Sequence, residues 1–279
     1  MPSPISFRRQ YRQLLRGPDE DIDLARAALL ISGEMYPDID VQHYLDALDS
    51  MATDIHVSTA ASSDRKALAT AVSDYLFRRR GFSGNQDDYY DPRNSYLNQV
   101  MDRHLGIPIT LSLVYMEVGR RLGLPAEGIG LPGHFIVRID GEGEGLYVDA
   151  FHQGRLMTGR ECLQAVESMF QGRLNLRLEH LLPYSSRQIL VRLLGNLKIN
   201  YMRQKQLRQA LATMDLMVLT DPAAPANYKE RATMFAQWGR HSLAAADLAK
   251  YLELAPQAND IQEIQRQIRA LWYTVASAN

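Results

Sequence analysis

The C-terminal part of the chain repeats itself with a period of 34 residues, and this repeat limits the fold more than any other feature. Pro222 and Pro256 lie 34 residues apart, and apolar positions match at the same offset. The matched pairs are Ala210 with Ala244, Met214 with Leu248, and Val218 with Leu252. Small residues inside a helix pair, larger apolar residues behind them and a closing proline are typical of stacked helix pairs. We therefore expect an all-α region over residues 183–279.

The N-terminal region, residues 1–80, is also predicted to be helical. Residues 22–31 are rich in helix formers, and the acidic residues that precede them suit the positive end of a helix. A second stretch carries apolar residues at helical spacing, namely Val41, Tyr44, Leu45 and Leu48. A third helix is expected from Ser63 to Arg79, closed by a run of arginines.

Residues 81–182 mix helices with a small antiparallel sheet. A polar loop from Gly81 to Asn94 is followed by two helices, of which the second begins at Pro108. Residues 134–139 then alternate in polarity, and residues 146–150 answer them across a glycine-rich turn at 141–145, which predicts a β-hairpin. Together the three segments indicate the α+β class.

Several phrases of this middle segment resemble a known fold in their order and spacing. The phrases are Gly106–Ser112, Arg120–Ala126, Pro132-Gly133-His134-Phe135 and Asp149-Ala150-Phe151-His152. They are similar to the papain/transglutaminase-like core. Asp91–Leu97 and Leu131–Phe135 more closely resemble bacterial SirB-type proteins, in which such a core precedes C-terminal tetratricopeptide-like (TPR) repeats. The resemblance covers most of the chain.

In that family a cysteine opens a helix, a histidine begins one strand and an aspartate lies on the next. By position, His134 takes the histidine role and Asp149 the carboxylate role, which fixes the imidazole tautomer. The cysteine position falls on Pro108, which offers no nucleophile. The resemblance therefore implies a transglutaminase-like pseudoenzyme that acts as a peptide-binding, protein-binding or regulatory scaffold, with His134 and Asp149 as a residual dyad.

Two alternatives keep a chemical role for the site. The first is a hydrolase or acyl transferase in which the hydroxyl of Thr110 or Ser112 attacks, assisted by the His134–Asp149 dyad. The second is a metal that His104 and His152 would bring to His134, although nothing in their spacing demands one. We expect no metal and no cofactor. The single thiol, Cys162, follows the aspartate in chain order and is expected to be buried rather than nucleophilic.

The register of the hairpin decides whether His134 and Asp149 lie on one face of the sheet. A five-residue turn without a bulge would place them on opposite faces, and a bulge would reverse this. If they meet, we expect a pocket for a peptide or small polar ligand. Its predicted binding residues are Asn94, Asn98, Pro108, Thr110, Ser112 and His152.

Charge and composition limit which kinds of partner and which cellular compartment we expect for this protein. The net charge of -1 gives no field that would attract nucleic acid, and no apolar run approaches the roughly 20 residues that span a bilayer. One cysteine excludes a disulfide framework within the chain, so we expect a cytoplasmic protein. From Arg187 onward, twelve Lys or Arg face seven Asp or Glu. The repeat region could therefore meet an acidic protein partner, or the acidic stretch Asp19–Asp23 of its own chain. The oligomeric state is left open.

Overall fold

The computed structural model describes residues 4–59, 64–142 and 144–277. The predicted helix start at Ser63, the turn residue Gly143 and the chain ends at 1–3 and 278–279 lie outside the described residues. The chain divides into two compact units, Met1–Leu193 and Leu194–Asn279. Helices and a small antiparallel sheet make up the structure, so the predicted α+β class is confirmed. The finer division into segments 1–80, 81–182 and 183–279 stays a prediction.

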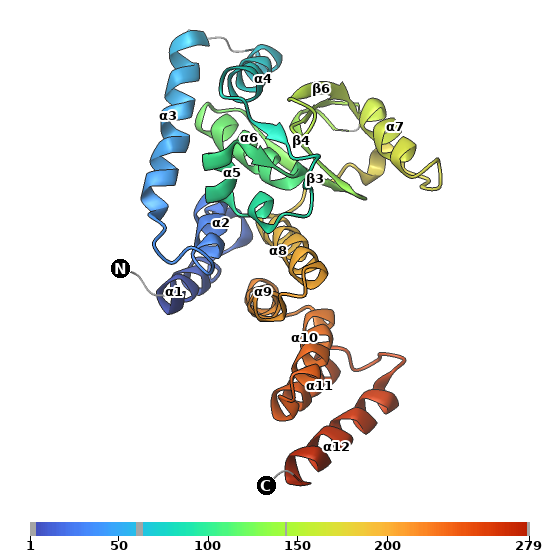
Figure 1. The fold of residues 1–279 in the computed structure, drawn as a ribbon. Coiled ribbons are helices and arrows are strands. Elements are labelled where there is room, and N and C mark those ends of the chain that lie inside the picture. Colours follow the sequence, from blue (N-terminus) through green and yellow to red (C-terminus); the bar gives the residue numbers. More distant parts are fainter. Residues whose placement is uncertain (1–3, 60–63, 143, 278–279) are drawn as a thin grey trace. The chain divides into compact units, whose positions relative to one another are not determined.

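Helices dominate the N-terminal part of the first unit (Figure 1). They are α1 (Pro4–Leu14), α2 (Leu24–Ser32), α3 (Val41–Thr59) and α4 (Arg65–Ser73), and α4 continues into a π-helical turn, η2 (Asp74–Arg79). The side chain of Asp23 caps α2 by accepting from the backbone N–H of Arg26 at 2.9 Å. Because α2 is buried along almost its whole length, it forms the centre of this helical layer.

A four-stranded antiparallel sheet follows, in the order β3-β4-β5-β6. Its strands are β3 (Glu127–Leu131), β4 (His134–Asp140), β5 (Leu146–Asp149) and β6 (Arg155–Thr158). Before it come β1 (Ser83–Gly84), the 3-10 turn η3 (Pro92–Ser95), α5 (Leu97–Arg103), β2 (Leu105–Gly106) and α6 (Pro108–Arg121). Strands β1 and β2 pair in parallel. Helix α6 is buried from Pro108 to Gly119 and packs against β4.

The other face of the sheet packs against α7 (Gly159–Met169) (Figure 1). The apolar residues in this layer are Ile129, Leu131, Ile136, Tyr147 and Met157 from the sheet with Cys162, Leu163 and Val166 from α7. Helix α7 begins with a capping box, in which Thr158 and Glu161 satisfy each other's backbone N–H groups. The sheet is therefore covered by a helix on each face.

The β4–β5 hairpin contains a β-bulge. Arg138 pairs with Tyr147 and Asp140 pairs with Leu146, so Ile139 has no partner across the ladder. Five residues, 141–145, separate the paired Asp140 and Leu146 along the chain. A turn with an odd number of residues would by itself place His134 and Asp149 on opposite faces of the sheet. The one extra residue of the bulge shifts the register, so that they come to the same face. The two side chains consequently share a face.

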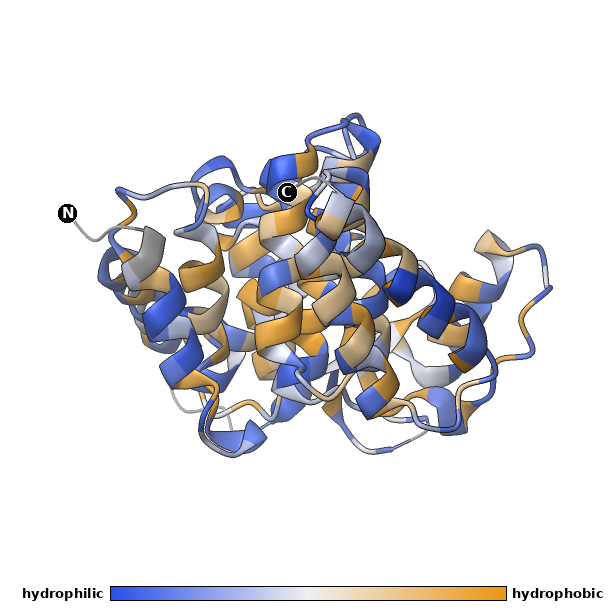
Figure 2. Cartoon of the chain, turned by 90° about the horizontal axis from the view of Figure 1, so that it is seen from below, coloured by the Kyte–Doolittle hydropathy of each residue, from blue (hydrophilic) through white to orange (hydrophobic). Residues whose placement is uncertain are grey.

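The second unit consists of helices. Helix α8 (Ser186–Arg203) enters it, and α9 (Leu207–Thr220), α10 (Pro225–Gln237), α11 (His241–Leu254) and α12 (Ile261–Ser277) follow. The repeat predicted from the sequence is visible in the packing, because Ala210 and Ala244 are both fully buried. Both apolar and polar residues occur along the helices of the chain (Figure 2). Within the described residues, no helix combines the length and the apolar character that a membrane crossing requires.

Candidate functional site

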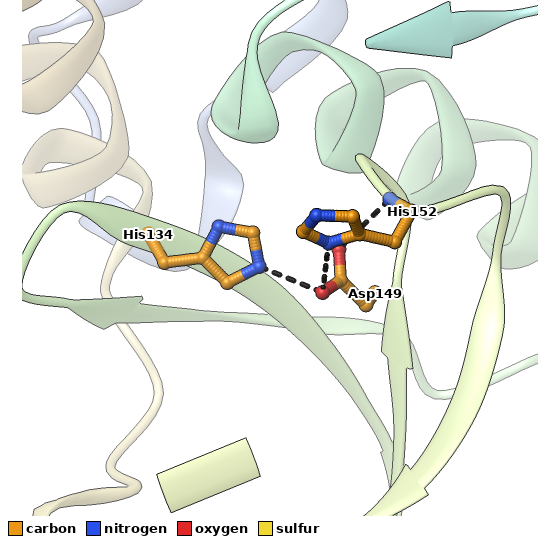
Figure 3. A group of neighbouring side chains, drawn as sticks. All are labelled: His134, Asp149 and His152. Carbon is orange, nitrogen blue, oxygen red and sulfur yellow. Dashed lines mark hydrogen bonds and ion pairs between the residues drawn. The ribbon is translucent and has the colours of Figure 1, made fainter. Parts of the chain in front are cut away.

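His134 and Asp149 form a buried pair at one end of the sheet. His134 is the first residue of β4 and Asp149 the last of β5, and they are 5% and 3% exposed. The His134 Nε2 atom lies 2.9 Å from Asp149 Oδ2 (Figure 3). Gly133, with φ of +65°, makes the tight turn that leads into β4. The two residues assigned by resemblance are therefore hydrogen-bonded to each other.

A second histidine completes the cluster. His152 Nδ1 lies 2.8 Å from the same oxygen, Asp149 Oδ2, and both rings turn toward it (Figure 3). The other carboxylate oxygen, Oδ1, accepts from the backbone N–H groups of Phe151 and His152, each at 3.1 Å. The side chain of His152 is 53% exposed, whereas those of His134 and Asp149 are buried. The cluster is thus closed on one side and open at His152.

The electrostatics of the cluster keep Asp149 ionised. Burial on its own raises the pKa of Asp149, but the hydrogen bonds from His134 and His152 outweigh burial and hold that pKa well below its usual range. The hydrogen bond to Asp149 raises the pKa of His152. An ionised carboxylate only accepts, so each ring must present an N–H to it. When the rings are neutral, His134 Nδ1 and His152 Nε2 are left as bases.

Pro108, on which the resemblance places the family's nucleophile, offers no reactive group. Pro108 is the first helical residue and is buried. Two residues on, Thr110 Oγ1 lies 2.7 Å from the carbonyl oxygen of Asn94 and accepts from the N–H of Ile107 at 3.1 Å. Ser112 Oγ donates to the carbonyl of Phe135 at 3.3 Å. Both hydroxyls therefore donate to backbone carbonyls rather than to a side-chain base in this structure.

Cys162 and His104 lie elsewhere in the unit. Cys162 is on α7, fully buried, and its burial, together with the nearby charge of Asp149, raises the pKa of its thiol to about 12. His104 follows the last residue of α5 in a left-handed conformation, and its ring packs at a tilt against Phe82, with ring centres 4.4 Å apart. Of the two histidines that the sequence offered as companions for His134, only His152 is in the cluster.

The two asparagines predicted to bind a ligand make contacts within the fold. Asn94 is fully buried, accepts from Asn85 Nδ2 at 3.1 Å and donates to the carbonyl of Asp88 at 2.7 Å. These bonds hold the loop before α5 in place. Asn98 is 3% exposed, and its Oδ1 is buried without a hydrogen-bond partner among the described residues. A binding role for either residue stays a prediction.

Arg192 supports the site, although sequence reasoning did not identify it. Its Nη2 donates to the carbonyl oxygens of Leu131 and His134, both at 2.6 Å. Its guanidinium also lies over the rings of Phe135 and Tyr184. Arg192 therefore fixes the turn from which His134 projects. It lies 58 residues after His134 in the chain, so no local pattern could have revealed the contact.

Comparisons with known proteins match each of the two parts of the chain to a protein family. Residues 42–195 match the model of the transglutaminase-like superfamily, and residues 197–269 match that of the tetratricopeptide repeat. A UPF0162 protein of Xylella fastidiosa is 36% identical over 91% of this chain and 92% of its own length. A UPF0162 protein of Vibrio cholerae is 28% identical over 91% of this chain and 95% of its own. F-box only protein 21 of Mus musculus is 35% identical over 46% of this chain and 21% of its own.

Proposed function

Because this chain belongs to the transglutaminase-like superfamily and to its UPF0162 group, we propose that it is a non-catalytic scaffold that binds a protein or peptide partner. The SirB-type family with TPR repeats, inferred from the sequence, is confirmed. The observation that carries the proposal is Pro108, which stands at the first position of α6 where the family's nucleophile would stand. An imino acid cannot form the covalent acyl intermediate.

The neighbouring groups support the same reading. The hydroxyls of Thr110 and Ser112 donate to carbonyl groups, and the Cys162 thiol is buried with a raised pKa. A reactive thiol needs a lowered pKa and access to solvent. None of these three groups therefore replaces the missing cysteine. The single cysteine also supports a reducing, cytoplasmic location as part of the proposal.

The repeat unit supplies a surface for the partner. A cavity of about 450 Å³ opens between α10, α11 and α12, lined by Ala232, Ala236, Leu248, Ala270 and Leu271 among others. Small alanines on its walls leave room for side chains of an extended or helical segment. Stacked helical repeats bind partners along such concave surfaces. We assign the partner-binding role to this cavity.

A pair of alanine-to-arginine variants tests the binding role. Ala270 is exposed and lines the cavity, whereas Ala246 is exposed on α11 outside its lining. A peptide-display library would be selected against the full chain, and the enriched peptides measured against each variant. We expect A270R to weaken binding at least tenfold, because the arginine fills the cavity, and A246R to leave it unchanged. Equal binding by both variants would refute the assignment.

The buried His134–Asp149 pair favours a second candidate, a hydrolase. Asp149 binds His134 through Nε2, which leaves Nδ1 as the base. The attacking oxygen would come from a water, or from the hydroxyl of Thr110 or Ser112 after it has left the carbonyl that it now binds. A screen of amide and ester substrates, with His134→Ala beside the wild type, separates the two functions. For a scaffold, any turnover is the same in both proteins. Turnover that disappears in H134A would establish the hydrolase instead.

A further inference from the structure

Three ligand-type atoms converge at the end of the sheet. His134 Nε2, Asp149 Oδ2 and His152 Nδ1 all lie within 4.8 Å of one another. We propose that this cluster binds a divalent transition-metal ion of the Zn²⁺ class. The inference goes beyond the scaffold function and rests on a different part of the chain from the repeat cavity.

The spacing of the three atoms suits such an ion. Zinc lies about 2.0–2.2 Å from imidazole nitrogen and carboxylate oxygen, so tetrahedral ligands stand roughly 3.2–3.6 Å apart. In the cluster, both nitrogens lie 2.8–2.9 Å from the shared oxygen. Each imidazole presently uses, for a hydrogen bond, the nitrogen that would coordinate the ion. When the ion binds, each neutral ring keeps its single proton by carrying it on its other nitrogen. Each coordinating nitrogen would then lie about 0.3–0.8 Å farther from Asp149 Oδ2 than it does now.

Hydrogen bonds from neighbouring groups orient the three candidate ligands. The backbone N–H groups of Phe151 and His152 bind Asp149 Oδ1, which leaves Oδ2 directed at the two rings. Arg192 fixes the backbone of His134 through its carbonyl oxygen. Partners that orient a ligand from behind are typical of metal sites and raise their affinity. The buried negative charge of Asp149 also favours a cation beside it.

The donor types select the ion. Two imidazoles with one carboxylate favour Zn²⁺ and its first-row neighbours, whereas Mg²⁺ and Ca²⁺ prefer oxygen alone. Three protein ligands leave one coordination position unfilled, and the exposed side of His152 would place it toward solvent. A site of this kind accepts water or a ligand from solution. It would occupy the end of the sheet where β4 begins and β5 ends.

The test is a calorimetric titration of Zn²⁺ into the chelator-treated full-length protein. Histidine-to-glutamine variants at His152 and at His43 provide the comparison, because His43 is an exposed histidine on α3 outside the cluster. We expect one ion per wild-type chain, an affinity at least tenfold weaker in H152Q, and no change in H43Q. Co²⁺ added in place of Zn²⁺ should give visible d–d absorption in the wild type and H43Q, and lose it in H152Q.

Asp149→Asn provides a second, independent variant, with circular dichroism to check that each variant folds. Loss of the Zn²⁺ stoichiometry in folded D149N supports the site. If zinc binds the wild type, H152Q and D149N equally well, the ion binds elsewhere and the proposal is overturned. A wild-type protein that takes up no zinc also overturns it. The A270R variant should bind zinc normally, so failure of the metal site and failure of the peptide-binding role are distinguishable.

Discussion

Cys162 illustrates how a single residue's surroundings decide its chemistry. It packs in the apolar layer between the sheet and α7, and burial raises its thiol pKa to about 12. At about pH 8 only a very small fraction is thiolate, so we expect Cys162 to resist a thiol reagent such as Ellman's in the native state and to react fully in denaturant. The exposed Ser168 on the same helix, changed to cysteine, should react at least a hundredfold faster. Rapid native reaction of Cys162 would contradict its burial.

Asp91 gives a prediction about pH. Burial alone would raise its pKa, but hydrogen bonds from the side chain and backbone N–H of Arg93 hold that pKa below its ordinary value of 3.8. A carboxylate with a depressed folded-state pKa adds stability above its unfolded pKa and loses it as the pH falls through the folded value. Asp91→Asn should therefore lower the free energy of unfolding by about 1–2 kcal/mol at neutral pH. In urea titrations, this difference should shrink as the pH falls below 3.8 and through the lower folded-state pKa of Asp91.

The site residues differ in how far the sequence alone could identify them. His134 and Asp149 follow from their motif positions, since each phrase around them is local. The hydroxyls of Thr110 and Ser112 could not be judged in this way. Their roles depend on the carbonyls of Asn94 and Phe135, which come from other elements and approach only after folding. The meeting of His152 with the dyad likewise depends on the turn after β5, in which Asp149 accepts from two backbone N–H groups.

At the scale of elements, the β4–β5 turn determines the site through its register. A Cβ placed on Gly145 would lie 2.0 Å from the carbonyl oxygen of Asp140, so no side chain fits without moving the turn. Gly145→Ala should therefore destabilise the chain by about 1–3 kcal/mol. Gly195→Ala provides the control, because nothing lies near its Cβ and alanine favours helix α8 by up to about 1 kcal/mol. Chemical denaturation would measure both, and a stable G145A protein would contradict the close approach.

The hairpin was predictable from alternation, but the strands on either side of it were not. Strand β3 contains Gly128 and Gly130, which lower its strand propensity. These glycines are required by tertiary packing. The ring of Phe135 occupies the space where a Cβ on Gly128 would stand, and the ring of Tyr184 does the same at Gly130. Strand β6 is only four residues long and follows β5 closely. Strand β3 is therefore specified by packing with residues such as Tyr184, which lies far along the chain, and β6 is too short to show a pattern of its own.

The N-terminal acidic stretch shows a similar tertiary role. The carboxylate of Asp19 accepts from the backbone N–H groups of Ser186 and Arg187, at 2.7 and 3.0 Å. These are among the first N–H groups of α8, which have no partner within the helix. A carboxylate there also meets the positive end of the helix dipole. The sequence offered two partners for the basic C-terminal region, and one of them was the acidic stretch of the same chain. Asp19 of that stretch thus contacts the first turn of α8.

At the scale of the whole molecule, the two compact units should respond separately to mutation. In the second unit, Arg231 binds Asp247 at 2.8 Å and Asp215 at 3.0 Å, which ties α10 to α11 and α9. Asp247 is nearly buried, so Arg231→Ala would leave a buried charge uncompensated and cost about 3–5 kcal/mol. We expect faster amide hydrogen exchange in residues 194–277, because the network belongs wholly to that unit.

The control for this prediction is Arg266→Ala, at an exposed position on α12. Hydrogen exchange followed by mass spectrometry would compare both variants with the wild type, peptide by peptide. In R231A, the exchange of β4, β5 and α6 should stay at the wild-type rate, because their core is built from residues of the first unit. Equal acceleration across both units would instead mean that the chain unfolds as one cooperative body, and that the dyad depends on the repeats for its stability.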